Sequence, residues 1–113
     1  RKKKNIYYVC KAVRFSADDF QYADDSIKND EQSILAIINE APDVLEFVDV
    51  KWQENENIVL RAASMHPNSI VHASHKLKNN EEFAKKLLLK VPQCIEFFPS
   101  ELPFYKDLVL LSL

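Results

Sequence analysis

Three histidines in the second half of the chain come nearest, by type and spacing, to a metal site. His66, His72 and His75 lie close together in the sequence, and zinc needs three or four ligands that converge on one point. Aromatic residues stand one or two periods of 25 residues away from position 72, at Tyr22, Phe47 and Phe97. This pattern favours a packed ring at His72, and no cysteine lies nearby. We therefore predict no metal site.

Paired acidic residues suggest either calcium binding or acid–base catalysis. Asp18-Asp19, Asp24-Asp25 and Asp30-Glu31 each place two carboxylates side by side. A calcium loop needs oxygen ligands at alternating positions around a glycine, and the sequence contains no glycine. The pairs fall in turns and where helices are expected to begin, so we interpret them as capping or solvated carboxylates.

No pattern of residues indicates catalysis or cofactor binding. Ser16 and Cys10 have no histidine at a recognisable motif spacing. The lack of glycine also excludes Walker A and dinucleotide-binding loops, in which glycine lets the backbone approach phosphate closely. We expect a protein that is not an enzyme and has no cofactor.

The two cysteines, Cys10 and Cys94, are far apart and form no CxxC motif. This spacing argues against a disulfide framework and a zinc site. Reduced cysteines are typical of an intracellular, reducing compartment. No apolar run approaches the roughly 18 residues of a membrane helix, so we expect no membrane span.

Charge is distributed unevenly along the chain. Residues 17–57 carry twelve acidic and two basic side chains, a net charge of −10, whereas residues 1–16 carry six basic and no acidic ones. The acidic segment favours a basic protein partner, although an ordinary solvated surface has the same composition. The basic start, with Tyr7 and Tyr8 near it, suggests nucleic acid or anionic lipid. The acidic pI of about 5.9 and the acidic segment argue against nucleic-acid binding.

A period of 25 residues runs through the chain. Pro42, Pro67 and Pro92 mark it, and apolar residues recur at fixed distances after them without a gap. We count positions from the proline of each unit, which we call the repeat origin. The residues three positions after the origin are Phe20, Leu45, Ile70 and Ile95, those five after it are Tyr22, Phe47, His72 and Phe97, and those ten after it are Ile27, Trp52, Leu77 and Leu102. The residues seventeen positions after it are Val9, Ile34, Val59, Ala84 and Val109, and those twenty-one after it are Val13, Ile38, Ala63, Leu88 and Leu113.

Each period predicts a long helix followed by a short one. Within the long helices apolar residues fall three and four apart, and Asp30, Asn55 and Asn80 stand where an N-cap belongs. A proline then ends the long helix and opens the short one. The expected long helices are 5–14, 30–40, 55–65, 80–90 and one from Tyr105, and the expected short helices are 18–24, 43–50, 68–75 and 93–98.

These elements predict an all-α fold, an α-solenoid of about 3.5 helix-hairpin repeats, because one helix pair cannot bury its apolar face alone but stacked pairs can. We expect one helical-repeat domain over residues 1–113. Its units are 5–29, 30–54, 55–79, 80–104 and a partial 105–113. The expected core is Leu35, Ile38, Leu45, Phe47, Trp52, Leu60, Ile70, Leu77 and Leu88. A compact helical bundle with a coincidental period is the alternative.

The partial last unit leaves its apolar residues without a following unit in the sequence. We expect the chain to be part of a longer protein. Further repeats, or another chain, should cover this C-terminal end.

Two segments resemble the repeats of the family called domain of unknown function 4116. Tyr22-Ala23 with Ile27-Lys28-Asn29-Asp30, and His72-Ala73-Ser74 with Leu77-Lys78-Asn79-Asn80, fit its aromatic-Ala-Ser-x-x-Leu-Lys-Asn-Asp segment before an apolar helix. The middle copy departs from it, with KWQENEN at 51–57. The resemblance implies a helical repeat of about 25 residues, seen in protists and in bacteria that live inside host cells. It implies no catalytic residue.

The most consistent function is a non-catalytic scaffold or adaptor for protein–protein interaction, and the resemblance adds a bacterial effector secreted into a host cell. The alternatives are an accessory, substrate-recruiting domain of an enzyme whose catalytic part lies elsewhere, and a nucleic-acid binder. Partner-binding side chains should project from the short helices and turns. We expect them to be Asp25, Glu46, Asp49, Val71 and His75.

Overall fold

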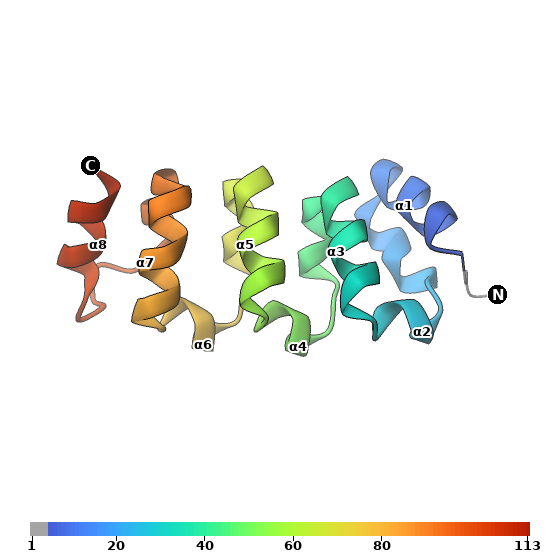
Figure 1. Ribbon diagram of the computed structural model, residues 1–113, viewed down its shortest axis with the longest axis horizontal. Coiled ribbons are helices and arrows are strands. Elements are labelled where there is room, and N and C mark those ends of the chain that lie inside the picture. Colours follow the sequence, from blue (N-terminus) through green and yellow to red (C-terminus); the bar gives the residue numbers. More distant parts are fainter. Residues whose placement is uncertain (1–4) are drawn as a thin grey trace.

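The computed structural model describes residues 5–113 and shows an elongated helical array of 49 × 21 × 19 Å. Long helices stand side by side along its longest axis (Figure 1). They are α1 (Ile6–Phe15), α3 (Glu31–Glu40), α5 (Glu56–Met65), α7 (Glu81–Lys90) and α8 (Tyr105–Ser112). No strand occurs within residues 5–113. The predicted all-α solenoid is confirmed, and each long helix begins and ends within about one residue of its expected bounds.

The short half of each unit differs from the prediction. A single second helix was expected, but the structure has a 3₁₀ helix followed in the first three units by a one-turn α-helix. The 3₁₀ helices are η1 (Ala17–Tyr22), η2 (Pro42–Glu46), η3 (Pro67–His72) and η4 (Pro92–Phe97), and the one-turn helices are α2 (Asp25–Lys28), α4 (Val50–Gln53) and α6 (His75–Lys78). The expected helices 43–50 and 68–75 were therefore wrong after Glu46 and after His72, where the chain leaves the 3₁₀ helix.

Local side-chain bonds explain this division. Asp24, Asp49 and Ser74 have extended backbones, which interrupt the helix. Each then caps the one-turn helix after it, because its side-chain oxygen accepts a backbone N–H from that helix. A capped restart satisfies the amides that a continuous helix would have satisfied internally.

The long helices begin and end as the sequence predicts. Asp30 accepts from Ser33 N, Asn55 from Asn57 N and Ile58 N, and Asn80 from Phe83 N. A proline follows the C-cap residue of α3, α5 and α7 and opens the next 3₁₀ helix. No described residue has a positive φ, so the chain turns without any left-handed conformation.

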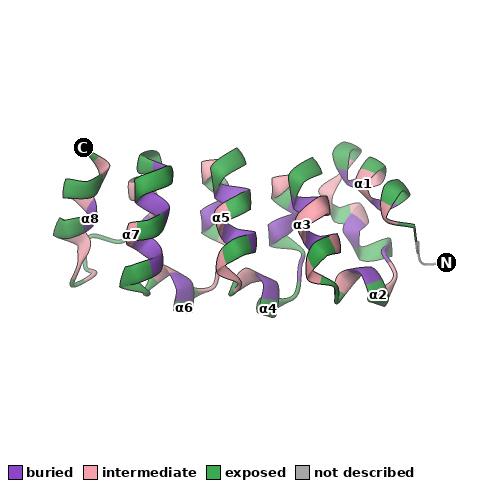
Figure 2. Cartoon of the chain, in the orientation of Figure 1, coloured by how far each residue is buried: buried purple, intermediate pink, exposed green. Residues whose placement is uncertain are grey.

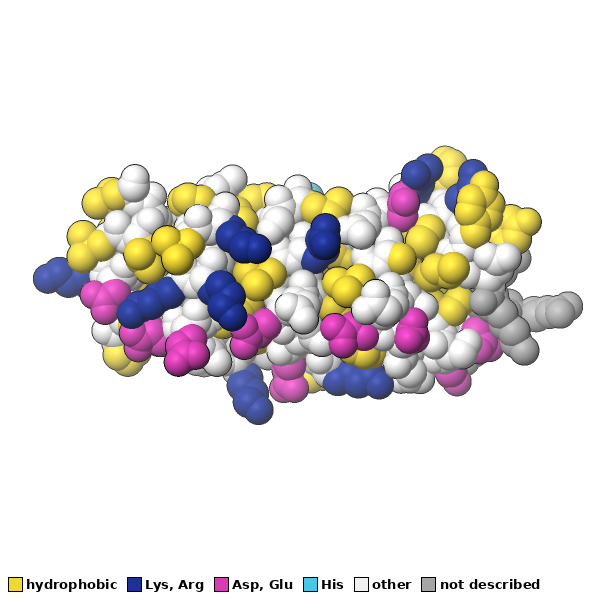
Figure 3. Space-filling view, viewed as in Figure 1, with side chains coloured by type: hydrophobic (Ala, Val, Ile, Leu, Met, Phe, Trp, Pro, Cys, Tyr) yellow, Lys and Arg dark blue, Asp and Glu magenta, His cyan; other side chains and the backbone are white. Residues whose placement is uncertain are grey.

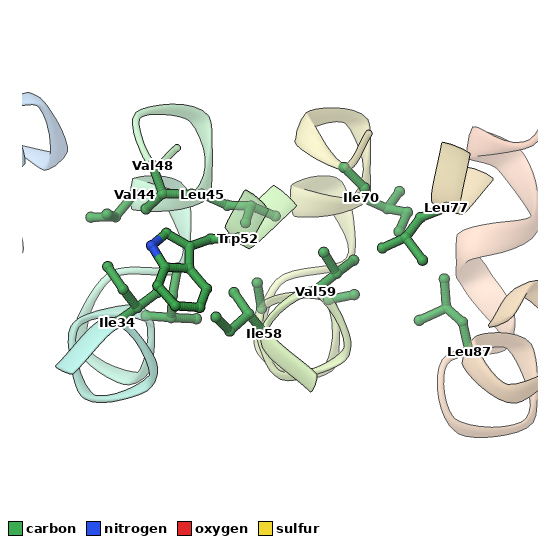
Figure 4. Packing of buried hydrophobic residues seen from close by; sticks show 14 of the residues in the cluster. Ile34, Val44, Leu45, Val48, Trp52, Ile58, Val59, Ile70, Leu77 and Leu87 are labelled. Atoms are coloured by element: carbon green, nitrogen blue, oxygen red, sulfur yellow. The ribbon is translucent and has the colours of Figure 1, made fainter. Parts of the chain in front are cut away.

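The core lies between a layer of long helices and a layer of 3₁₀ helices. Side chains from both layers point toward each other there (Figure 4), and the buried residues follow the array from end to end (Figure 2). Of the expected core, Ile38, Leu45, Trp52, Ile70, Leu77 and Leu88 are buried. The apolar columns three, ten, seventeen and twenty-one residues after the repeat origin are buried in the first three units, whereas Ile95 and Leu102 of unit 80–104 are half-buried.

Three expected core residues are not buried. Leu35 and Leu60 are half-buried on the outer side of their long helices, and Phe47 is 43% exposed. The column five residues after the repeat origin ends the 3₁₀ turn, and it is exposed at Tyr22 and Phe47 and half-buried at His72 and Phe97. The next column is buried at Ala23, Val48, Ala73 and Phe98. The prediction that His72 is a packed ring fails in part for the same reason, because His72 is only half-buried.

Hydrogen bonds connect consecutive units. Trp52 Nε1 donates to the Lys28 carbonyl at 2.7 Å, and the Ser74 amide donates to the Gln53 carbonyl at 3.0 Å. Since each bond joins the short elements of neighbouring units, these elements are held at a fixed offset along the array. The surface that they form is therefore set by the repeat.

The C-terminal helix is covered on one side only within the described residues. Leu108 is fully buried against the preceding unit, but Leu110 is 59% and Leu113 94% exposed. Leu113 occupies the column that is buried at Ile38 and Leu88. That a further unit covers this end stays a prediction. No helix within residues 5–113 is long and apolar enough to span a membrane.

Candidate interaction surface

The five predicted partner-binding residues lie on or beside the short elements, and all are exposed. Glu46 ends η2 and Val71 lies in η3 at the equivalent position of the next unit. Asp25 begins α2 and His75 begins α6, again at equivalent positions. Asp49 caps α4 and accepts from Lys51 N at 3.2 Å. The repeat thus places side chains of different chemistry at the same sites in successive units.

A hollow of about 390 Å³ lies between the short elements of the first two units. It brings together Asp25 from the first unit and Asp49 from the second. Phe20, Phe47 and Val48 supply its apolar part. Glu46, Val71 and His75 do not line it. The structure therefore unites two of the five predicted residues in one site and leaves the other three along the same layer.

Lys28, which lines the hollow, and Lys51, which lies beside it, both bond to neutral oxygens of the protein. Lys28 Nζ donates to the Gln21 carbonyl at 2.8 Å, and Lys51 Nζ donates to Asn29 Oδ1 at 2.8 Å. Lys28 also lies 5.8 Å from the centre of the Phe20 ring. The side chains that line the hollow include two carboxylates and one lysine, Lys28, a net charge of −1, and Lys51 lies beside the hollow.

Exposed aromatic rings are the feature that the sequence interpretation missed. Tyr22 is 54% and Phe47 43% exposed, one period apart. A ring exposed beside carboxylates offers an apolar contact and a cation–π partner. The signal for this exposure was present in the sequence: the position after each ring is apolar in every unit, at Ala23, Val48, Ala73 and Phe98.

The residues that suggested metal chemistry are placed apart. His66 Nδ1 lies 3.6 Å from Asp43 Oδ1, and His75 is exposed on α6. No group of three or more His, Cys, Asp or Glu side chains in residues 5–113 is arranged to hold a metal ion. Asp24 and Asp30 act as helix caps, as predicted, since they accept from Ser26 N at 3.1 Å and from Ser33 N at 3.0 Å.

The two cysteines are free thiols in different surroundings. Burial raises the pKa of Cys94 to about 11, so this thiol stays protonated and unreactive at neutral pH. Cys10 is half-buried, and burial together with nearby Glu40 raises its pKa. Arg14 lowers the pKa of Cys10, but by less than burial and Glu40 raise it, so neither thiol has the depressed pKa of a reactive cysteine.

A family model described as Domain of unknown function (DUF4116) matches residues 5–53 and again residues 55–103. The chain belongs to this family. Each match spans about two of the 25-residue units, so the DUF4116 repeat is a pair of the structural units. Comparisons with curated proteins and with solved structures gave no match.

The paired repeat explains why KWQENEN departs from the motif. The two segments that fit the motif, at 22–30 and 72–80, fall in the first halves of the two DUF4116 matches, whereas residues 51–57 lie where one match ends and the next begins. Packing alternates in the same way. The buried column beside the exposed rings is Ala23, Val48, Ala73 and Phe98, small and large in turn.

Proposed function

We propose that this DUF4116 segment is a non-catalytic scaffold that binds a basic segment of a protein partner on its short-element layer. The observation that carries the proposal is the hollow between the first two units, where Asp25 and Asp49 accompany the exposed Phe47 ring. A lysine or arginine has an apolar stem and a cationic end. The stem suits the ring and the cation suits the carboxylates.

The solenoid supports an extended binding site. Stacked units create a long surface on which side chains outside the core decide what binds. From the hollow, Glu46 and then Val71 and His75 continue along the same layer, and η2 packs directly against η3. A partner seated at the hollow would therefore meet these residues next. Long-range attraction to the acidic segment 17–57 would raise its association rate.

The family resemblance adds a setting to the proposal. It suggests that the partner is a host protein met inside a cell, after secretion of the protein as a bacterial effector. Two free cysteines suit a reducing compartment. Capture of a host protein that binds through a basic segment would support this setting.

The test uses a fluorescent peptide of alternating lysine and leucine, with binding followed by fluorescence anisotropy. The double variant Asp25→Asn, Asp49→Asn removes two charges, while the amide oxygen introduced at position 49 can still cap α4. We expect it to weaken binding by at least about tenfold, because charge-assisted bonds are lost. Wild-type affinity should also fall as salt is added.

The matched control is Asp43→Asn with Glu54→Gln, which removes two exposed charges of the same acidic segment outside the hollow. It should change affinity little. Equal losses in the two double variants would show that total charge, and not the hollow, attracts the peptide. Affinity that does not respond to salt would also contradict the proposal.

A further inference from the structure

A second groove, of about 520 Å³, lies on the outer side of the long helices between α3 and α5. Leu35 and Leu60, at equivalent positions of the two helices, form its apolar part. Arg61 and Lys90 supply cations, from α5 and from the end of α7. In Figure 3, which looks onto this layer, Lys and Arg side chains gather over α5 and α7, and Asp and Glu side chains lie nearer the edge where these helices begin.

An ion pair bridges α5 and α7, whereas none in the described residues bridges α3 and α5 across the groove. Lys86 Nζ lies 3.2 Å from Glu56 Oε1 and joins α7 to α5. One period earlier the equivalent residues are Arg61 and Glu31, which both line the groove but form no ion pair within 4.0 Å. In the described part of the chain Arg61 and Lys90 make no ion pair at all. The groove therefore offers two cations that are not held in ion pairs, and with Glu31 its lining side chains carry a net charge of +1.

Each of the two helices also contributes one side-chain amide to the groove, at equivalent positions of the repeat. Gln32 and Asn57 are equivalent residues on α3 and α5, both exposed and both lining the groove. A carboxamide donates and accepts hydrogen bonds, which are the bonds that an extended peptide backbone leaves unmade. Packed helices lie roughly 8–10 Å apart and an extended chain advances about 3.3 Å per residue. The two amides would thus meet backbone groups about three residues apart.

We propose that this groove binds an extended peptide segment that carries an acidic side chain. Arg61 and Lys90 pair with the carboxylate, Gln32 and Asn57 bond to the backbone, and the leucines contact a neighbouring apolar side chain. The site is independent of the hollow on the short-element layer and takes a ligand of opposite charge. One solenoid segment would then join a basic and an acidic partner segment.

A nucleic acid fits the groove less well. No aromatic ring lines it to stack on a base. Glu31 also lines it, so the lining side chains carry only one net positive charge, which matches a single carboxylate better than a chain of phosphates. Two cations also give little of the counterion release on which nucleic-acid affinity depends.

The experiment measures binding of a fluorescent peptide of alternating glutamate and leucine to the full chain. We expect Arg61→Ala to weaken binding by at least about tenfold. The matched control is Lys76→Ala, which removes one exposed cation of α6 outside the groove and should leave affinity unchanged. Since Arg61 is exposed, the variant should fold, and a thermal melt like that of the wild type would verify this.

Three outcomes would overturn the proposal. The first is an equal loss of affinity in Arg61→Ala and Lys76→Ala. The second is that single-stranded RNA displaces the peptide at the same concentration as unlabelled peptide does. The third is that the amide NMR signals of Gln32, Asn57 and Leu60 do not move when the peptide is titrated. The Asp25→Asn, Asp49→Asn variant should bind the acidic peptide normally. Failure of either site can therefore be recognised without reference to the other.

Discussion

Ser69 is a buried polar residue at a position where the neighbouring units have less polar side chains. It is 2% exposed in η3, and its hydroxyl oxygen has no hydrogen-bond partner within the described chain. The equivalent residues of the neighbouring units are the buried Val44 and Cys94. A buried hydroxyl without a partner is destabilising. The buried positions of this column therefore accept apolar side chains on both sides of Ser69, at Val44 and Cys94.

We predict that Ser69→Ala raises the free energy of unfolding by about 1 kcal/mol, because the unpaired hydroxyl is removed. Urea denaturation measures this change. The control is Ser64→Ala, an exposed serine whose hydroxyl donates to the Leu60 carbonyl at 2.7 Å, for which we expect a change within about 0.5 kcal/mol. A clear loss of stability in Ser69→Ala would mean that the hydroxyl has a partner in solution.

At the scale of elements, the 3₁₀ helices determine how the long helices stack. η2 packs against α3, against α5 and against the neighbouring η1 and η3. Leu45 is its fully buried anchor. Removing side-chain volume there leaves a cavity among several elements at once, and the surrounding helices can close it only in part.

We expect Leu45→Ala to lower the free energy of unfolding by about 2–5 kcal/mol, the usual range for a buried leucine. Thermal or urea unfolding tests it. Val50→Ala is the comparison, since Val50 is an apolar residue that is 58% exposed and its truncation should have little effect. If the two variants unfold alike, Leu45 does not anchor the unit.

The long helices were predictable and the short elements were not, for a physical reason. In α3, α5 and α7, apolar spacing, an N-cap and a terminal proline all indicate the same bounds. In the short half, a 3₁₀ helix, an extended residue and a new cap follow one another within a few residues. The caps Asp49 and Ser74 would have revealed the restart, but the apolar pattern alone also fits one continuous helix. Phe47 was misplaced for this reason, whereas the exposure of Asp25 and Asp49 followed from their place in turns.

At the scale of the molecule, each unit packs mainly on its neighbours, so the array has a middle and two ends. α3 and α5 are covered on both sides by described elements, while α1 and α8 are covered on one. Local opening should therefore begin at the ends. The groove between α3 and α5 lies in the more protected part, whereas the hollow is formed largely by the first unit, at one end of the array.

We predict that backbone amides of α5 exchange with solvent at least about tenfold more slowly than those of α8. Hydrogen exchange followed by mass spectrometry or NMR gives the rates. In the Leu45→Ala variant the protection of α3 and α5 should fall most. Equal rates along the chain would instead indicate that all units open together in one cooperative step.

The absence of positive φ angles among the described residues has a consequence for how such a protein can diversify. No turn in residues 5–113 demands glycine, so the connecting positions are limited only by their caps, their prolines and the buried columns. Most exposed positions can therefore mutate without rebuilding a bend. Duplicated units could keep one scaffold while their outward residues drift toward different ligands, as the change from Asp25 to His75 at one position already illustrates.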